Sequence, residues 1–148
     1  MVQDRISKAI RLFNKTARVN VNKQCSIARR SLKPDIVVID EKAKEVAILD
    51  VTCPFENGPE AFAKAREIKV QKYSPEAEAY RAKGYNVTVD AIVVGALGTW
   101  DPSNNTALQA VHIPKRYREK MVRLTIMDVI SASTEIYWRH ILGDRYVK

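Results

Sequence analysis

Val and Ile recur along the chain in patterns that predict buried strands. They dominate residues 34–39 and 45–52, where apolar side chains fall on both faces of each segment, as expected of strands covered on two sides. Positions 40–45 between them are charged except for Ala43, so the two runs should form an antiparallel hairpin. Residues 86–97 alternate and then become wholly apolar, which predicts a further strand, and residues 17–25 alternate weakly, which predicts a short one.

Helical spacing predicts helices before and after these strands. Ile6, Ile10 and Phe13 recur at intervals of four and three residues, which places them on one face of a helix over residues 2–14. Two more helices are expected toward the C-terminus: a short one over residues 104–111, and a long basic one that follows Pro114 and runs to about Leu142.

Another helix should follow the second strand of the hairpin. Asn57 or Gly58 suits its cap, and Gly84 suits the position just after its end. Ser74-Pro75 is a second start signal, so the helix should bend or restart there. The resulting order of elements predicts an α/β fold with a mixed sheet in three layers.

The length of 148 residues suits a single domain with a substantial core. Within it we expect an N-terminal helix and a basic connection over residues 1–32. A core should follow over residues 33–100, and a C-terminal helical extension over residues 101–148.

The formal charge of +8 indicates that this α/β protein has a polyanionic partner. Nucleic acid is the first candidate and an anionic membrane surface the second. The longest uncharged apolar run, residues 91–100, is shorter than the ~18 residues of a membrane span, so insertion into a membrane is not expected, and DNA, not a membrane, is the expected partner. Cys25 and Cys53 have no metal-binding spacing with the two histidines and are expected to be free thiols.

Asp35 and Asp50 lie where the hairpin strands border the core, and a buried carboxylate costs several kcal/mol unless a partner compensates it. If the turn is centred between Lys42 and Ala43, Asp35 lies directly opposite Asp50, with the Cβ atoms ~4.5–5.5 Å apart. Two such charges need a proton or a cation between them. Mg²⁺ or Mn²⁺ prefers oxygen ligands of this kind and can activate water. The alternative is structural: Asp35 caps a turn and Asp50 pairs with a lysine.

The helix after Asp50 supplies a cation. At about 100° per residue, Lys72 falls inside its apolar sector, and Lys69 falls at the edge, beside Tyr73. An ammonium that reaches the carboxylates can stabilise a pentavalent phosphate; a lysine that extends outward is the alternative. Two acids, a lysine and a divalent metal form a phosphodiesterase site, and the net charge makes nucleic acid its substrate. The apolar sector is expected to contain Ala61, Phe62, Ala65 and Ile68.

Pro34-Asp35 followed by Asp50 resembles the PD-(D/E)xK nuclease signature. LKPDIVVID, AILDVTCPFEN, AKAREIKVQKY, GYNVTVDAIVVGALGTWDPSN and SASTEIYWRHILG, which lie between about Lys33 and Tyr146, resemble the restriction-like endonuclease domain of site-specific non-LTR retrotransposons. These elements insert into ribosomal RNA genes and other defined sites. The resemblance implies a restriction-endonuclease-like fold and a Mg²⁺- or Mn²⁺-dependent enzyme that nicks DNA. The freed 3′ hydroxyl would then prime reverse transcription.

The same resemblance implies a nuclear protein that works with the reverse transcriptase portion of a larger polyprotein. It assigns catalysis to Asp35, Asp50 and the segment that contains Lys69, Lys72 and Tyr73. Thr52 stands where the commoner signature has lysine; in the retrotransposon group the following helix supplies that lysine. The sequence leaves open which of the two lysines serves. Glu56 is either a third metal ligand, besides Asp35 and Asp50, or a cap of the helix.

Two basic clusters are candidates for contacts with the DNA backbone. Both would give affinity without base specificity, and a solvated helix face is the alternative for the second. Two other functions stay open: a catalytically silent DNA-binding or assembly module of the same fold, and a resolvase-like nuclease that acts on branched DNA. The first cluster consists of Arg29, Arg30 and Lys33, and the second of Lys115, Arg116 and Arg118.

Overall fold

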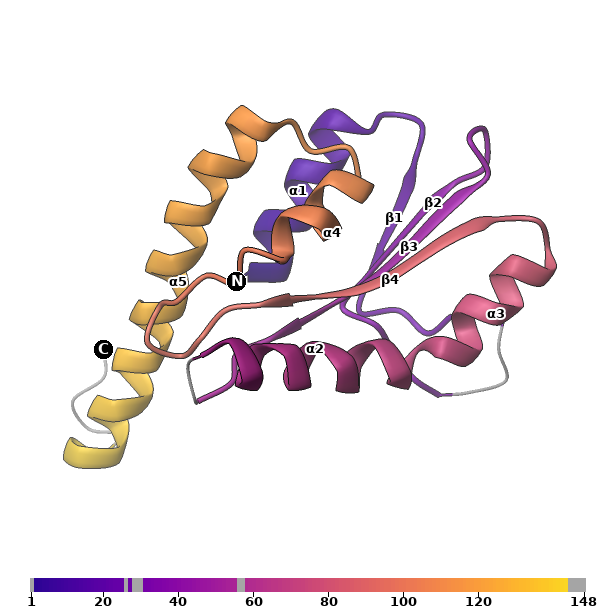
Figure 1. Cartoon of the computed structure of the whole chain (residues 1–148). Helices are drawn as coiled ribbons and strands as arrows, with labels where there is room; N and C mark the ends of the chain where they lie inside the picture. The colour runs from indigo at the N-terminus through magenta and orange to yellow at the C-terminus, as the bar shows by residue number, and fades with distance from the viewer. Residues whose placement is uncertain (1, 26, 28–30, 56–57, 144–148) are drawn as a thin grey trace.

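The computed structural model describes residues 2–25, 27, 31–55 and 58–143. Within these residues the chain is an α/β protein with a four-stranded mixed sheet and five helices (Figure 1). The elements are α1 (Val2–Phe13), β1 (Arg18–Val21), β2 (Ile36–Asp40), β3 (Glu45–Thr52), α2 (Pro59–Lys72), α3 (Ser74–Ala82), β4 (Asn86–Val93), α4 (Asn104–Ala110) and α5 (Lys115–Leu142).

The strands lie in the order β1-β2-β3-β4. β1 and β3 both run antiparallel to β2, whereas β4 runs parallel to β3. The parallel step needs a crossover, which α2 and α3 provide along one face of the sheet, while α1, α4 and α5 cover the other face (Figure 1). The mixed sheet predicted from the order of elements is therefore confirmed.

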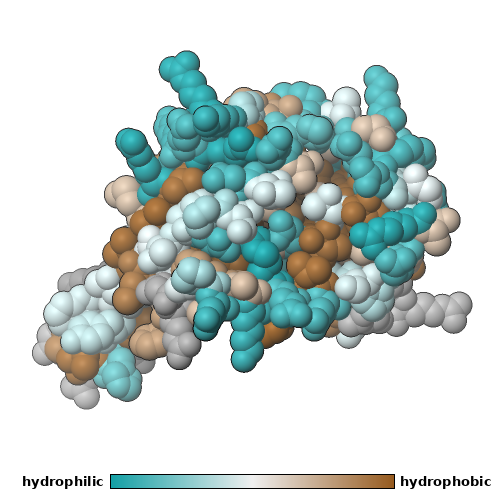
Figure 2. Space-filling model, viewed as in Figure 1, coloured by the Kyte–Doolittle hydropathy of each residue, from teal (hydrophilic) through white to brown (hydrophobic). Residues whose placement is uncertain are grey.

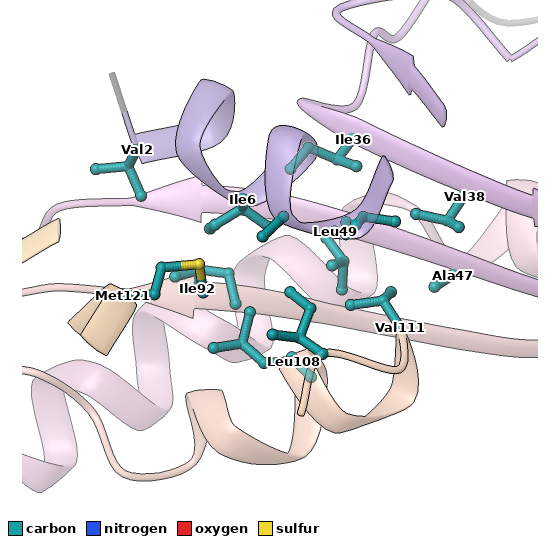
Figure 3. Packing of buried hydrophobic residues seen from close by; sticks show 14 of the residues in the cluster. Val2, Ile6, Ile36, Val38, Ala47, Leu49, Ile92, Leu108, Val111 and Met121 are labelled. Atoms are coloured by element: carbon teal, nitrogen blue, oxygen red, sulfur yellow. The ribbon is translucent and has the colours of Figure 1, made fainter. Parts of the chain in front are cut away.

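Successive apolar side chains of each strand point to opposite faces of the sheet, so each face has its own apolar cluster. Ile36, Leu49 and Ile92 point toward α1, α4 and α5, where they meet Ile6 and Leu108 (Figure 3). The opposite cluster, under α3 and the junction of α2 with α3, contains Val37, Ile39, Val46, Ile48, Tyr73, Ala77, Tyr80 and Val87. Full burial of a large apolar side chain contributes roughly 1.5–3 kcal/mol, so the two clusters fix which way each strand faces.

The turn between β2 and β3 has the predicted centre. Asp40 pairs with Glu45, and the Asp40 carboxylate accepts the N–H groups of Lys42 and Ala43, both at 3.0 Å. Thr16 donates to the other Asp40 oxygen at 2.7 Å. An aspartate that binds the backbone two and three residues ahead stabilises a turn. Asp40 therefore fixes the register of the hairpin.

Several details differ from the sequence-based expectation. β2 begins at Ile36 rather than Pro34, and β4 ends at Val93. Ile68, expected in the apolar sector of its helix, is 55% exposed, and Trp138 is 47% exposed. Trp138 is exposed because the second half of α5 extends beyond the sheet, where hydrophobic atoms reach the surface (Figures 1 and 2). None of the helices within the described ranges is long and apolar enough to cross a membrane.

A polar network covers the free edge of β4. Asn104 acts as a substitute strand: its side chain accepts the Val93 N–H and donates to the Val93 carbonyl, both at 2.8 Å. Arg66 reaches around the edge from α2 and donates to Asn104 at 2.7 Å, to Asp101 at 2.8 Å and to Asp90. Although burial alone would raise it, hydrogen bonds from Arg66 and Ser103 hold the pKa of Asp101 below its usual value. The network joins α2, β4 and α4.

We predict that Asn104→Ala lowers the free energy of unfolding by about 1–3 kcal/mol, because it leaves the buried Val93 N–H without its partner and the Val93 carbonyl with the 3.3 Å hydrogen bond from the Asp101 N–H. Urea denaturation followed by circular dichroism measures the change. Asn105→Ala is the matched control, since Asn105 is exposed, and it should cost less than about 0.5 kcal/mol. Equal losses from the two variants would contradict the proposed role of Asn104.

Candidate functional site

The hairpin register brings Asp35 and Asp50 together. Asp35 immediately precedes β2, and the pairing of Ile36 with Leu49 places it opposite Asp50 in β3. The two residues are joined directly: the Asp35 N–H donates to Asp50 Oδ1 at 3.1 Å, and the Val51 N–H donates to Asp35 Oδ2 at 2.7 Å. Each carboxylate thus accepts a backbone N–H from the opposite strand. The predicted proximity of the two aspartates is confirmed.

Lys69 is the lysine that reaches this pair. Its Nζ lies 2.6 Å from Asp50 Oδ2, with the Asp50 side chain 5% exposed and the Lys69 side chain 25% exposed. Asp50 shares a face of β3 with Val46 and Ile48, the face covered by α2 and α3. The helix therefore crosses directly over the carboxylates, and the ammonium compensates a charge that would otherwise be buried alone.

Lys72 occupies a different place. It is exposed, although the helical spacing had placed it in the apolar sector. Its ammonium lies 5.1 Å from the centroid of the Tyr73 ring, a cation–π contact. Lys72 is the last residue of α2, and its side chain extends outward, which is the alternative that the sequence left open for a lysine of this helix.

Tyr73, the residue that follows α2, is buried beside the site. The side chain is 1% exposed, and its hydroxyl donates to the Lys33 carbonyl at 3.4 Å. Burial, reinforced by the nearby Asp50 and Asp35 charges, raises the pKa of Tyr73 well above its usual range. The hydroxyl is therefore a neutral donor at physiological pH, and it links α2 to the segment that leads into Asp35.

Two further groups lie in the apolar cluster around Tyr73. Cys25 is a buried free thiol, and Glu76 is 1% exposed. Burial, with a smaller contribution from Glu76, raises the pKa of Cys25 to about 11. The thiol is thus protonated and weakly nucleophilic, and it fills space in the core.

The surroundings of Asp35 disfavour its ionised form. Burial raises the pKa of Asp35, the hydrogen bond from Val51 lowers it, and the adjacent Asp50 charge raises it again. Two carboxylates and one ammonium leave a net charge of −1 in a partly desolvated site. Such a site attracts a further cation or proton.

The side chains present fit a hard divalent cation in part. Asp35 and Asp50 offer carboxylate oxygens on one face of the sheet, and Mg²⁺ is commonly held by one or two carboxylates together with waters and substrate phosphates. Among the described residues, no group of three or more His, Cys, Asp or Glu side chains is arranged to hold a metal. Glu56, the third predicted ligand, lies outside the described residues, as do Arg29 and Arg30.

The remaining predicted DNA contacts fall on two sides of the sheet. Lys33 is exposed and lies two residues before Asp35, next to the site. Lys115, Arg116 and Arg118 open α5, which packs on the face opposite Lys69 (Figure 1). The structure therefore does not bring the second basic cluster to the aspartates.

Arg66 was missed by the sequence analysis. It precedes Lys69 by one helical turn and anchors α2 to β4 through Asp90 and Asp101. The spacing of three residues places Arg66 near Lys69 on the helix, but it does not identify the partners of Arg66, which lie 24 and 35 residues away along the chain.

A search against protein-family models and a search of curated proteins both gave no match for this chain.

We predict that Asp35→Asn stabilises the protein at pH 7 by about 1–4 °C in the thermal midpoint. Removing one of two directly opposed like charges is worth roughly 0.2–1 kcal/mol. The raised pKa of Asp35 means that the folded state binds its proton more tightly than the unfolded state does. The contribution of Asp35 to the free energy of unfolding of the wild type is therefore fully present below about pH 4, and it is lost as the pH rises through the pKa of Asp35 in the folded state. Asparagine cannot ionise, so the variant does not lose this contribution.

Thermal unfolding from pH 3 to pH 8 in EDTA measures the difference between wild type and Asp35→Asn. The gap should close as the pH falls below about 4, the ordinary aspartate value. Glu119→Gln removes an exposed carboxylate on α5 and should show no such gap. Equal midpoints for wild type and Asp35→Asn at pH 7 would mean that burial and the Asp50 charge do not disfavour the ionised form of Asp35.

Proposed function

We propose that this chain is a metal-dependent DNA endonuclease domain with a restriction-endonuclease-like fold. The observation that carries the proposal is the meeting of three side chains from three elements: Asp35 before β2, Asp50 in β3 and Lys69 in α2, with Lys69 Nζ 2.6 Å from Asp50 Oδ2. Two carboxylates that can hold a divalent metal, together with an ammonium, suit metal-dependent phosphodiester hydrolysis. The net charge of +8 favours nucleic acid as the substrate.

Each residue has a role that follows from its contacts. Asp35 and Asp50 would hold Mg²⁺ or Mn²⁺, which supplies an activated water and neutralises phosphate charge when bound. Lys69 lies close enough to Asp50 to donate to a phosphate oxygen or to orient the attacking water. Tyr73 acts as a positioning residue, because its buried hydroxyl links α2 to the Lys33 carbonyl two residues before Asp35.

The resemblance of the sequence to retrotransposon endonuclease domains makes the proposal more specific. The product would be a nick whose 3′ hydroxyl primes reverse transcription, in the nucleus and together with a reverse transcriptase. The hairpin, the crossover helix and the parallel β4 agree with the order of elements that this resemblance implies.

We predict that Asp50→Asn lowers Mg²⁺-dependent nicking of supercoiled plasmid by ~10²-fold or more. Asparagine is isosteric and still accepts the Asp35 N–H, so the fold and DNA binding should be kept within about threefold. The assay compares nicked and supercoiled plasmid on agarose gels, with EDTA as the metal-free reference. Asp4→Asn, at an exposed position of α1 in the other layer, is the matched control. Equal nicking by wild type and Asp50→Asn would overturn the assignment.

We predict that Lys69→Ala and Lys72→Ala separate in the same assay. Lys69 contacts Asp50, so its loss should reduce nicking by ~10²-fold; Lys72 lies over the Tyr73 ring, so its loss should change nicking by less than about threefold. Both variants remove the same charge from the same helix, which controls for non-specific effects on DNA binding. A larger loss from Lys72→Ala would assign the catalytic ammonium to the other lysine.

A further inference from the structure

A second cationic feature lies on the opposite side of the sheet from Asp50. The connection between β4 and α4, the start of α4 and the first half of α5 enclose a groove of about 570 Å³. Its lining mixes an aromatic ring, charged side chains and one aliphatic side chain. The lining residues are Trp100, Asn105, Lys115, Arg118, Glu119, Val122 and Arg123.

The groove carries an excess of positive charge. Lys115, Arg118 and Arg123 fall within an arc of ~140° on α5 at about 100° per residue, and Glu119 is the single acid of the lining. Within the described part of the chain, none of the three cations has a carboxylate oxygen within 4.0 Å. Arg118 donates to the Asn105 carbonyl at 3.3 Å, which holds its guanidinium against α4. The cations are thus directed to the groove and not used in internal ion pairs.

Trp100 forms the aromatic wall. Its backbone pairs with Val94 in an isolated antiparallel bridge, and part of its ring packs against the apolar cluster under α1, α4 and α5. The indole nitrogen is buried and has no hydrogen-bond partner among the described residues. The Trp100 side chain as a whole is half-buried and lines the groove, so its exposed part is the part available for stacking.

We propose that this groove binds a single-stranded segment of nucleic acid. Its phosphates would contact Lys115, Arg118 and Arg123, and one base would lie against Trp100. Proteins that bind single strands combine a cationic groove with aromatic side chains on which bases stack, whereas a duplex keeps its bases stacked inside the helix. The inference does not depend on hydrolysis at Asp50, because the groove lies in the other layer and needs no metal.

Binding of labelled 12-nucleotide single-stranded DNA, single-stranded RNA and duplex DNA tests the proposal. The measurement is fluorescence anisotropy in EDTA on an Asp50→Asn, Trp138→Phe background, in which Trp100 is the one remaining tryptophan. We expect single strands to bind tighter than the duplex and to quench Trp100 emission; the DNA and RNA arms show which sugar is preferred. Lys115→Gln with Arg123→Gln should weaken single-strand binding about tenfold and reduce the slope of log K against log salt by about 1.4, or ~0.7 for each lost contact.

Lys83→Gln with Lys120→Gln is the charge-matched control, since both lysines are exposed and neither lines the groove. It should leave the quenching of Trp100 in place and weaken binding by less than about threefold. Two results would show a surface that binds any polyanion and would overturn the proposal. One is an equal loss of single-strand affinity in the two double variants, and the other is heparin binding that quenches Trp100 emission as single strands do. Preference for the duplex without quenching would also overturn it. Because every arm is metal-free, these outcomes are independent of whether the chain nicks DNA.

Discussion

The register of the β2–β3 hairpin is the constraint on which the candidate site depends. Asp40 holds the turn through the N–H groups of Lys42 and Ala43, and this sets the pairing along both strands. A shift of one residue would turn Asp50 to the opposite face of the sheet. The same shift would also expose Val46 and Ile48 to the wrong apolar cluster, so the packing that stabilises the fold protects the pairing of Asp35 with Asp50.

The position of Lys69 is the second requirement, and it is set from both ends of α2. Phe62 packs against Ala91 and Val93 near the start of the helix, and Tyr73 is buried against β2 and β3 just after its end. Arg66 ties the middle to Asp90 and Asp101. With three attachments to the sheet, the helix presents the ammonium with little freedom, as preorganised electrostatic stabilisation requires.

The sequence predicted the strands, the helix restart at Ser74 and the Asp35–Asp50 pairing because these depend on local patterns. Val and Ile content marks strands, and a hairpin register can be counted from its turn. It could not decide between Lys69 and Lys72, because the choice depends on how α2 crosses the sheet, which helical spacing alone does not give. The roles of Arg66 and Asn104 could not be predicted for a related reason. Their partners are distant in sequence, and β4 can be identified as an edge strand only from the strand order.

The two faces of the sheet differ in the use they make of charge. On the α2 face, Asp35, Asp50 and Lys69 balance one another at close range, with one negative charge left over in a partly buried setting. On the α5 face, Lys115, Arg118 and Arg123 remain without close carboxylates in the described chain and border an aromatic wall. The first arrangement suits a cation and a reacting phosphate, which must be held in one geometry. The second suits a flexible polyanion, which gains from several weak, screened contacts. Because the sheet separates them, a substrate at one face leaves the other free.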